Sequence, residues 1–336
     1  MTGAINRPNI LLVALLGGFV LAGGDAAADP EAWRQQGWSR TDFGKTGVDL
    51  SEIVSGGPPK DGIPSIDDPQ FIPATEETSL GKTEPVIGLA LGGDARAYPL
   101  RILIWHEIVN DTVGGVPVTV TYCPLCNSAV VFERTVEGKA LDFGTTGKLR
   151  NLDLVMYDRQ TESWWQQFTG TAIVGAMTGT ELKTVPARLE SFELFRQRHP
   201  DGKVLTANRP GARAYGSNPY VRYDSRAAPY PLFTGELPQG IDPMARVVAL
   251  KVDGKPHAVS LALLRRQGEV RIGEVTLSWR AGQNSALDKA EIAAGRDVGN
   301  VIAHKRTESG VEDVVYDVTF AFVFNAFHPE AEIRAE

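Results

Sequence analysis

The sequence predicts an α+β fold that is rich in β-structure, with mostly antiparallel strands and short helices. Its 35 glycines and 21 prolines are spread along the 336 residues, which is typical of many short strands joined by turns rather than of a helical bundle. Apolar runs are short, and two pairs of them flank a Gly-Gly or an Asp-Gly turn, as in β-hairpins. Helices are expected mainly at the ends of such elements, which is an α+β pattern.

An internal repeat organises the elements. Residues 86–100 resemble residues 247–261, because each segment reads as a strand, a two-residue turn, a second strand and the start of a Leu-rich helix. The runs 192–200 and 321–329 both stop at His-Pro, where helices commonly end. We therefore predict a diverged duplication, with coincidence among short apolar runs as the alternative. The first repeat covers 80–205, a connecting region covers 206–239, and a shorter repeat without cysteines covers 240–336.

Within the first repeat, the order of elements places the motifs. We expect a helix over 100–109, a strand over 116–122, a turn, a strand over 129–134, and a closing helix over 189–198. Residues 29–79 form a Gly/Pro-rich N-terminal arm. Its scattered apolar residues predict an ordered segment that lies across the body of the protein rather than a flexible tail.

Residues 1–28 read as a signal peptide that is cleaved after Ala28. Arg7 precedes the apolar run 9–21, and three alanines end the segment. The alternative is a membrane anchor, but the run is shorter than the roughly 20 residues that a spanning helix needs. We therefore expect a periplasmic or secreted protein in an oxidising compartment. No later segment is apolar enough to span a bilayer, and a formal charge of −7 gives no electrostatic reason to bind nucleic acid.

The only two cysteines are Cys123 and Cys126, in a Cys-Pro-Leu-Cys motif between strand-like runs. Such a pair can form a disulfide, either inert or redox-active, or bind a soft metal, or remain as free thiols. A thioredoxin-like site is disfavoured because a strand rather than a helix follows the motif. A four-cysteine zinc site is excluded by the cysteine count.

His106 is the best candidate for a third metal ligand, since it lies on the predicted helix that leads into the cysteine hairpin. Two thiolates and an imidazole favour copper. Zinc is the less favoured ion and would need a fourth ligand, such as Glu107 or water. Glu107 and Asp111 are four residues apart and would share a neighbouring face of the helix. A hydrogen-bonded structural histidine is the alternative.

Two polar segments are candidates for a pocket or a supporting shell around the cysteines. The Gly/Thr segment 143–151 contributes Thr145 and Thr146, whose loop has a weak resemblance to an anion cradle. The segment 158–167 contributes a second group of side chains, namely Asp158, Thr161, Ser163, Trp164 and Gln166. The alternative for this second group is a capped turn over a buried tryptophan. Motifs of serine hydrolases, zinc proteases and dinucleotide enzymes are absent.

Several of these motifs together resemble the bacterial and archaeal domain-of-unknown-function family 3179. The carrying segments are 56–64, 97–100, 105–111, 122–126, 143–149 and 157–164. Thr146 and Trp164 are mild departures, where family members usually show Ser and Leu or a similar residue. The resemblance brings no assigned activity. It implies an exported protein in which the His-Glu, Cys-Pro-Leu-Cys, Gly-Thr-Thr-Gly and Asp-x-x-Thr-x-Ser segments meet at one site.

The leading functional hypothesis is a soft-metal or redox site at Cys123, Cys126 and His106, with copper as the metal. The first alternative is a metal-free protein that exchanges its disulfide with partner thiols. The second is a ligand-binding or scaffold protein in which a Cys123–Cys126 disulfide is only structural. The partner would accordingly be a metal donor or a thiol-redox protein.

Overall fold

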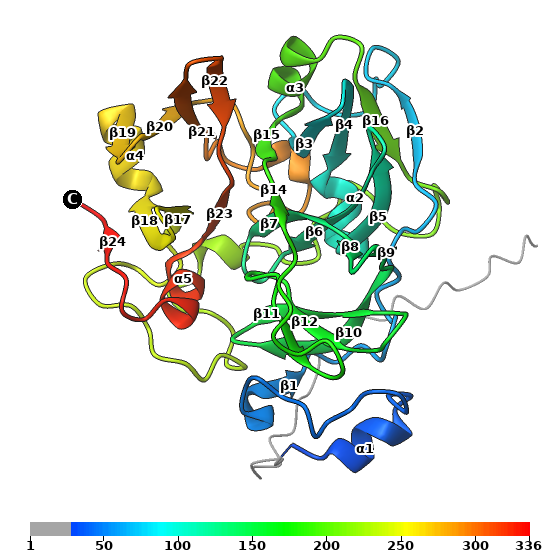
Figure 1. Cartoon of the computed structure of the whole chain (residues 1–336). Helices are drawn as coiled ribbons and strands as arrows, with labels where there is room; N and C mark the ends of the chain where they lie inside the picture. The colour runs from blue at the N-terminus through cyan, green and yellow to red at the C-terminus, as the bar shows by residue number, and fades with distance from the viewer. Residues whose placement is uncertain (1–27) are drawn as a thin grey trace, which may run out of the picture.

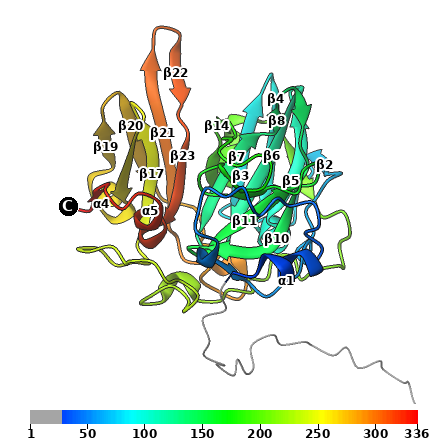
Figure 2. The ribbon, with the colours of Figure 1, turned by 60° about the horizontal axis from the view of Figure 1, so that its bottom comes forward.

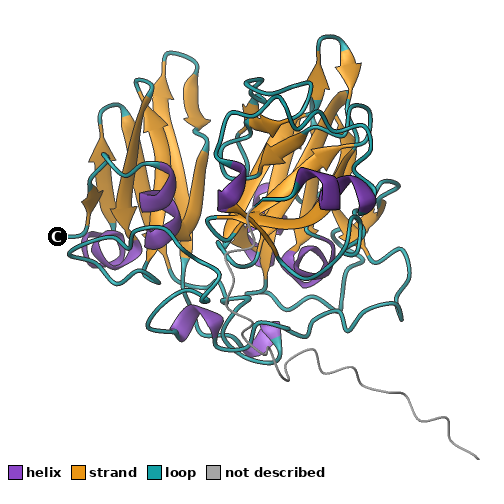
Figure 3. Cartoon of the chain, turned by 90° about the horizontal axis from the view of Figure 1, so that it is seen from below, coloured by secondary structure: helices purple, strands orange, loops and turns teal. Residues whose placement is uncertain are grey.

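The structure is a computed structural model that describes residues 28–336 (Figure 1). Strands dominate, most of them antiparallel, and the helices are short (Figure 3), which confirms the predicted fold class. The predicted signal peptide lies outside the described residues except for Ala28. Among residues 28–336, no helix combines the length and the apolar character needed to cross a membrane.

The first half of the chain forms three main sheets. The first has the order β15 (Arg188–Ser191), β3 (Pro85–Leu91), β4 (Asp94–Pro99), β16 (Lys203–Thr206) and β2 (Gln70–Pro73). The second has the order β14 (Thr184–Val185), β7 (Ser128–Glu133), β6 (Val116–Cys123) and β5 (Ile108–Val113). The third has the order β1 (Ile53–Ser55), β10 (Phe143–Arg150), β11 (Asp153–Asp158), β12 (Trp164–Gln166) and β13 (Ala172–Val174). A small hairpin joins β8 (Thr135–Val136) to β9 (Lys139–Ala140).

The second half forms two sheets beside the first half (Figure 2). One has the order β23 (Tyr316–Phe320), β17 (Arg246–Val252), β18 (Lys255–Ser260) and β24 (Ile333–Arg334). The other has the order β19 (Glu269–Ile272), β20 (Val275–Arg280), β21 (Asn300–Thr307) and β22 (Gly310–Asp313). The α-helices are α1 (Pro30–Gln35), α2 (Leu100–His106), α3 (Phe192–Arg198), α4 (Leu261–Gln267) and α5 (Ala321–Phe327). Single 3-10 turns are η1 (Leu50–Glu52), η2 (Tyr223–Ser225) and η3 (Ile292–Ala294).

The two halves share one topology. The order β15-β3-β4-β16 corresponds to β23-β17-β18-β24, and in both the first two pairings are antiparallel and the third is parallel. α2 and α4 follow the second hairpin strand, and α3 and α5 follow β15 and β23. The contacts between the halves are reciprocal, because β23 packs against β7 while β15 packs against β21. Each half therefore supplies one strand that lies against the other half.

Two predicted helix boundaries are wrong. The helix predicted over 100–109 ends at His106 because Glu107 adopts a φ of 59° and the next residues form β5. The helix predicted over 189–198 begins at Phe192, because residues 188–191 form β15 and pair with β3. In both segments, long-range strand pairing overrides the local helical pattern.

The N-terminal arm packs against the sheet that contains β10. The side chain of Asp29 accepts hydrogen bonds from the first backbone N–H groups of α1 and caps that helix. Trp33 and Trp38 each lie 5.1 Å from Trp164, measured between ring centroids. β1 pairs with β10 and extends the sheet. Trp164, a predicted pocket residue, therefore lies in an aromatic cluster beneath the arm.

Two glycines offer a matched test of this arm–sheet contact. Gly147 interrupts the register of β10 with a φ of 70°, and a Cβ there would collide with the carbonyl oxygen of Pro58. Gly138 has a φ of 76° but faces open space. We expect Gly138→Ala to cost about 1 kcal/mol of unfolding free energy, and Gly147→Ala more than about 3 kcal/mol because the arm must also shift. Urea unfolding of both variants measures the difference, and equal costs would contradict the contact.

Candidate functional site

The two cysteines lie in the tight turn between β6 and β7, called here the cysteine turn (residues 123–128). Backbone hydrogen bonds close it, from the N–H of Cys126 to the carbonyl of Cys123 and from Asn127 to Pro124, each 3.2 Å between N and O. Both side chains are buried free thiols. The predicted strand–turn–strand arrangement is present, with β6 paired to β7 on either side of the turn.

A second turn, between β10 and β11, brings oxygen atoms to the sulfurs. Asn151 and Leu152 both have positive φ, 54° and 61°, a conformation that is uncommon for a leucine. The Leu152 carbonyl oxygen lies 3.7 Å from Sγ of Cys123 and 3.5 Å from Sγ of Cys126. Oδ1 of Asp153 lies 3.3 Å from Sγ of Cys126. The two sulfurs and an Asp153 oxygen all lie within 4.8 Å of one another, and we call these three residues the cysteine centre.

Asp153 is completely buried and is held by two further donors. Its Oδ2 accepts hydrogen bonds from Nε2 of Gln166 at 2.6 Å and from the backbone N–H of Phe168 at 2.9 Å. Burial raises the pKa of Asp153 to about 6, although these hydrogen bonds and the contact with Cys126 act in the opposite direction. None of the leading influences on this carboxyl is a basic side chain.

Glu107 supplies a second buried carboxyl near the cysteine centre. Burial raises the pKa of Glu107 to about 8, and the charge of Asp153 adds to the effect. Burial likewise raises the pKa of the Cys123 thiol and, more strongly, that of Cys126. Four acidic groups are thus gathered in one buried region, and Glu107 experiences no compensating positive charge.

Tyrosines from the connecting region cover the cysteine turn. The hydroxyl of Tyr223 donates a hydrogen bond to the carbonyl of Leu125 at 3.0 Å. The ring of Tyr223 stacks on Tyr230 with centroids 4.7 Å apart. Tyr220 is partly buried and lies close enough to Cys123 and Glu107 to interact with them electrostatically. The centre is therefore enclosed, and large molecules do not reach the sulfurs without movement of this cover.

Strand β23 of the second half closes the other side of the cysteine turn. The carbonyl of Cys126 accepts hydrogen bonds from Oγ1 of Thr319 at 2.8 Å and from the backbone N–H of Phe320 at 3.2 Å. Nδ2 of Asn127 donates to the carbonyl of Val318 at 2.7 Å. Both halves of the chain therefore hold the turn that carries the cysteines.

His106, the predicted third ligand, lies outside the cysteine centre. Its Nδ1 lies 2.8 Å from the carbonyl oxygen of Pro64, and its Nε2 lies 2.7 Å from the hydroxyl of Tyr215. Burial lowers the pKa of His106. Both ring nitrogens are therefore engaged in linking α2 to the N-terminal arm and to the connecting region. Asp153 occupies the position beside the sulfurs that the sequence assigned to His106.

Of the predicted pocket residues, Glu107 and Gln166 lie at the site and the others have structural contacts elsewhere. Asp111 accepts hydrogen bonds from Arg96 and from the hydroxyl of Tyr98. The hydroxyls of Thr145 and Thr146 donate to the carbonyls of Ile63 and Val155, respectively. Asp158 accepts hydrogen bonds from Thr161 and Trp165. The Thr161 hydroxyl also contacts the hydroxyl of Ser163. Trp164 is buried beneath the arm. The predicted meeting of all these segments at the cysteines is therefore only partly seen.

Sequence reasoning missed Asp153 and the carbonyl of Leu152. Asp153 opens the apolar run of β11, and an acidic residue at that position is the one local signal that it offers. Its partner Cys126 is 27 residues away in the sequence. The contact depends on where the β10–β11 hairpin lies relative to the β6–β7 hairpin, which local patterns do not report.

The raised pKa of Glu107 predicts a pH dependence of stability in the reduced, metal-free protein. Because the folded pKa lies above the unfolded value of 4.5, the folded state retains a proton that the unfolded state has lost. Stability therefore falls as pH rises from about 4.5 to about 8. The unfolding free energy of Glu107→Gln, measured in urea, should therefore rise relative to that of wild type by on the order of 3 kcal/mol as the pH is raised from 5 to 8.5. The exposed Glu181→Gln is the control; the same gain there would refute the assignment.

The comparisons with known proteins give a family but no activity. The family model described as a protein of unknown function (DUF3179) matches residues 60–331. No curated protein matches the chain, and no solved structure matches it either. The matched range includes the cysteine turn, the β10–β11 hairpin and nearly all of both halves. The chain belongs to the DUF3179 family.

Proposed function

We propose that this is an exported metal-binding protein whose ion is held by Cys123, Cys126 and Asp153. One observation carries the proposal: two thiols and a carboxyl converge within 4.8 Å in a buried site, with Glu107 as a further buried acid nearby. Buried charges are costly unless they are paired or coordinate a metal. A bound cation supplies the positive charge that such a cluster otherwise lacks.

The raised pKa values are consistent with a metal site. Without a cation, burial favours the protonated forms of both thiols and of Glu107. Thiol ligands must lose their protons to bind an ion, so binding releases protons and strengthens as pH rises. The protein's own contribution is to place the two sulfurs and the carboxylate together before binding and to keep water away from them.

The donor set favours zinc over the copper expected from the sequence. The third group beside the sulfurs is a carboxylate rather than an imidazole, and carboxylate oxygen is an ordinary zinc ligand. Glu107 or a water molecule would complete four-coordination. Copper(I) is the second ion, since soft thiolates select it and Cys123 and Cys126 can bind it without Asp153.

The remaining features of the sequence fit an exported metal protein. A signal peptide ending at Ala28 would bring the chain to the periplasm or the outside, and a metal donor there would load it. We also infer that the shared topology of the two halves arose by duplication, and that the cysteine site belongs to the first copy alone. The charge of −7 offers no surface attraction for nucleic acid.

A second candidate function is disulfide chemistry without a metal. Cys126 contacts the Asp153 carboxylate, which can accept the thiol proton while Cys126 attacks a partner disulfide. Two such thiols lose two electrons and two protons to form the Cys123–Cys126 bond, and the partner disulfide is reduced to two thiols. This function requires the tyrosine cover to open, and both thiols have raised rather than lowered pKa values, which disfavours a nucleophilic role.

Metal analysis of the mature protein, purified without a chelating tag, tests the proposal. We expect close to one equivalent of zinc or copper in wild type and none in Cys123→Ser or Cys126→Ser. Asp153→Asn should weaken zinc binding by more than the about 10- to 100-fold that loss of an outer partner costs, because it removes a proposed ligand, but it should leave copper(I) binding nearly unchanged. His106→Ala is the matched control and should retain the metal, because the His106 ring lies outside the cysteine centre.

A thiol count on the same samples separates the alternatives. Absence of metal after reduction and exposure to zinc and copper would refute the metal site. If Cys123→Ser then accumulates mixed disulfides on Cys126, the exchange function holds. If it only lowers stability, the cysteine pair is structural.

A further inference from the structure

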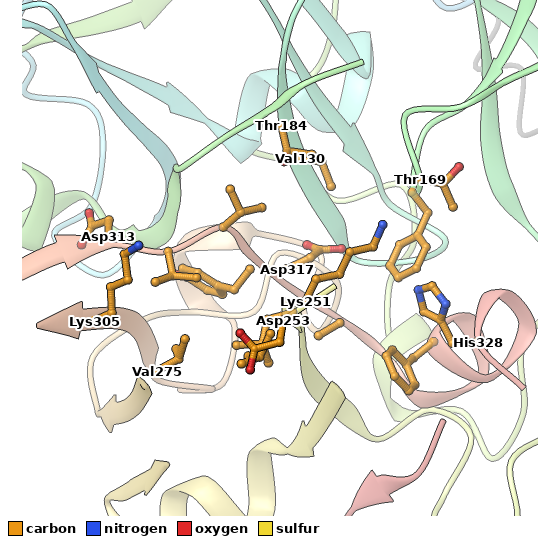
Figure 4. Close-up of a pocket in the computed structure, with 18 of the residues that line it drawn as sticks. Val130, Thr169, Thr184, Lys251, Asp253, Val275, Lys305, Asp313, Asp317 and His328 are labelled. Atoms are coloured by element: carbon orange, nitrogen blue, oxygen red, sulfur yellow. The ribbon is translucent and has the colours of Figure 1, made fainter. Parts of the chain in front are cut away.

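A pocket of about 580 Å³ lies between the two halves of the chain. Val130 of β7 and Thr184 of β14 line it from the first half, and residues of β17 and β23 line it from the second half (Figure 4). Phe168, which also lines the pocket, donates its backbone N–H to Asp153. Phe168 therefore contacts both the pocket, which it lines, and the cysteine centre, through its hydrogen bond to Asp153.

Asp317 gives this pocket an unpaired acceptor. The residue is 8% exposed, and Oδ1 accepts a hydrogen bond from the backbone N–H of Ala129 at 2.8 Å. Oδ2 is buried and has no hydrogen-bond partner in the described part of the chain. Burial raises the pKa of this carboxyl to about 6, although the nearby Ser128 hydroxyl acts in the opposite direction. That hydroxyl does not reach the carboxyl with hydrogen-bond geometry. A buried, unsatisfied carboxylate oxygen is costly. Because Asp317 lines the pocket, a small rotation of its side chain would bring this oxygen to a donor of a ligand.

The charges that line the pocket favour a cation. The acids are Asp253, Glu274, Glu312, Asp313 and Asp317, and the basic residues are Lys251, Lys305 and His328. Arg188 neutralises Asp313, and burial followed by the charge of Lys251 lowers the pKa of His328. Four acids then face two lysines, so an anionic ligand meets net repulsion and a cationic one meets net attraction.

The rest of the lining is apolar and aromatic. Phe168, Tyr316 and Phe324 contribute rings, and Val130, Ala249 and Val275 contribute aliphatic surface. Phe168 stacks on Phe327 of α5 with centroids 5.1 Å apart, which fixes its ring at the edge of the pocket. Aromatic faces attract a desolvated ammonium group and also cover an apolar ligand body.

We propose that this pocket binds a small organic amine, whose ammonium group pairs with Asp317 and whose apolar part packs against Phe168 and its neighbours. Figure 4 shows Asp317 in the middle of the pocket beside Lys251. Neither Lys251 nor any other described lysine or arginine forms an ion pair with Asp317, so the carboxylate is available to the ligand. The proposal does not depend on a metal at the cysteine centre.

Calorimetry with three probes of equal size tests the charge preference: phenethylamine, 2-phenylethanol and phenylacetate. We expect the amine to bind about tenfold more tightly than the alcohol, the fold-change of one charge-assisted contact, and the acid not to bind. Asp317→Asn should reduce the amine-to-alcohol ratio to near one. Lys251→Met should strengthen amine binding because it removes a competing cation. Asp201→Asn, at an exposed position outside the pocket, is the control and should leave the amine-to-alcohol ratio unchanged.

The same titrations in Cys123→Ser separate this pocket from the cysteine centre, because the amine preference should persist there. Equal affinity for amine and alcohol in wild type, or no binding of the amine up to 10 mM (about 2.7 kcal/mol of binding free energy), would overturn the proposal. This comparison uses wild-type protein, so it holds even if Asp317→Asn does not fold. Undiminished amine preference in a folded Asp317→Asn would also refute the assignment.

Discussion

The hydrogen bonds between the cysteine turn and β23 are the constraint on which the rest of the structure depends. They use the backbone carbonyl of Cys126, which leaves the sulfur on the opposite side, toward the β10–β11 hairpin. A reciprocal contact joins the halves elsewhere, where Oδ1 of Asn300 accepts from the backbone N–H of Ser191. The two halves therefore contact each other at two places, through β23 against β7 and through the equivalent strand β15 against β21. The geometry of the cysteine centre therefore belongs to the whole chain and not to the first half alone.

Asp224 is a buried acid of the same molecule whose negative charge is paired with two arginines, unlike the acids near the cysteines. Although burial acts against it, Arg246, the Ser285 hydroxyl and Arg296 hold the pKa of Asp224 below its usual range. The two arginines contact the carboxylate at 2.9 and 2.8 Å. A buried carboxylate keeps its charge in this way because guanidinium groups pair with it. Asp153 and Glu107 have no such partners, and their pKa values are raised. The left-handed backbone at Leu152 adds strain at the same place, and strained residues of this kind cluster at functional sites.

The features that the sequence predicts correctly are those that depend on residue patterns within short segments. Alternating apolar residues and glycine turns predict the hairpins of both halves, and the Cys-Pro-Leu-Cys motif between two strands predicts its own turn. The residues that lie beside the two sulfurs could not be predicted in this way. His106 was placed near the cysteines by chain proximity, but the positive φ of Glu107 ends the helix and leaves the ring between Pro64 and Tyr215. Asp153 comes from another hairpin, and only the packing of sheets brings it to Cys126. The polar residues of segment 158–163 satisfy their own turn, as such residues often do.

Two carboxylates connect the cysteine centre with the pocket between the halves. Asp153 contacts Cys126 with one oxygen and holds the backbone of Phe168 with the other. Asp317 holds the backbone of Ala129, one residue into β7, and its charge raises the pKa of Asp153. Neutralising either carboxylate therefore lowers the pKa of the other. Since coupling free energies are reciprocal, the proposed ion at the cysteines and the proposed ligand in the pocket would influence each other's binding. The second half thus acts on the cysteine centre through charge as well as through the hydrogen bonds of β23.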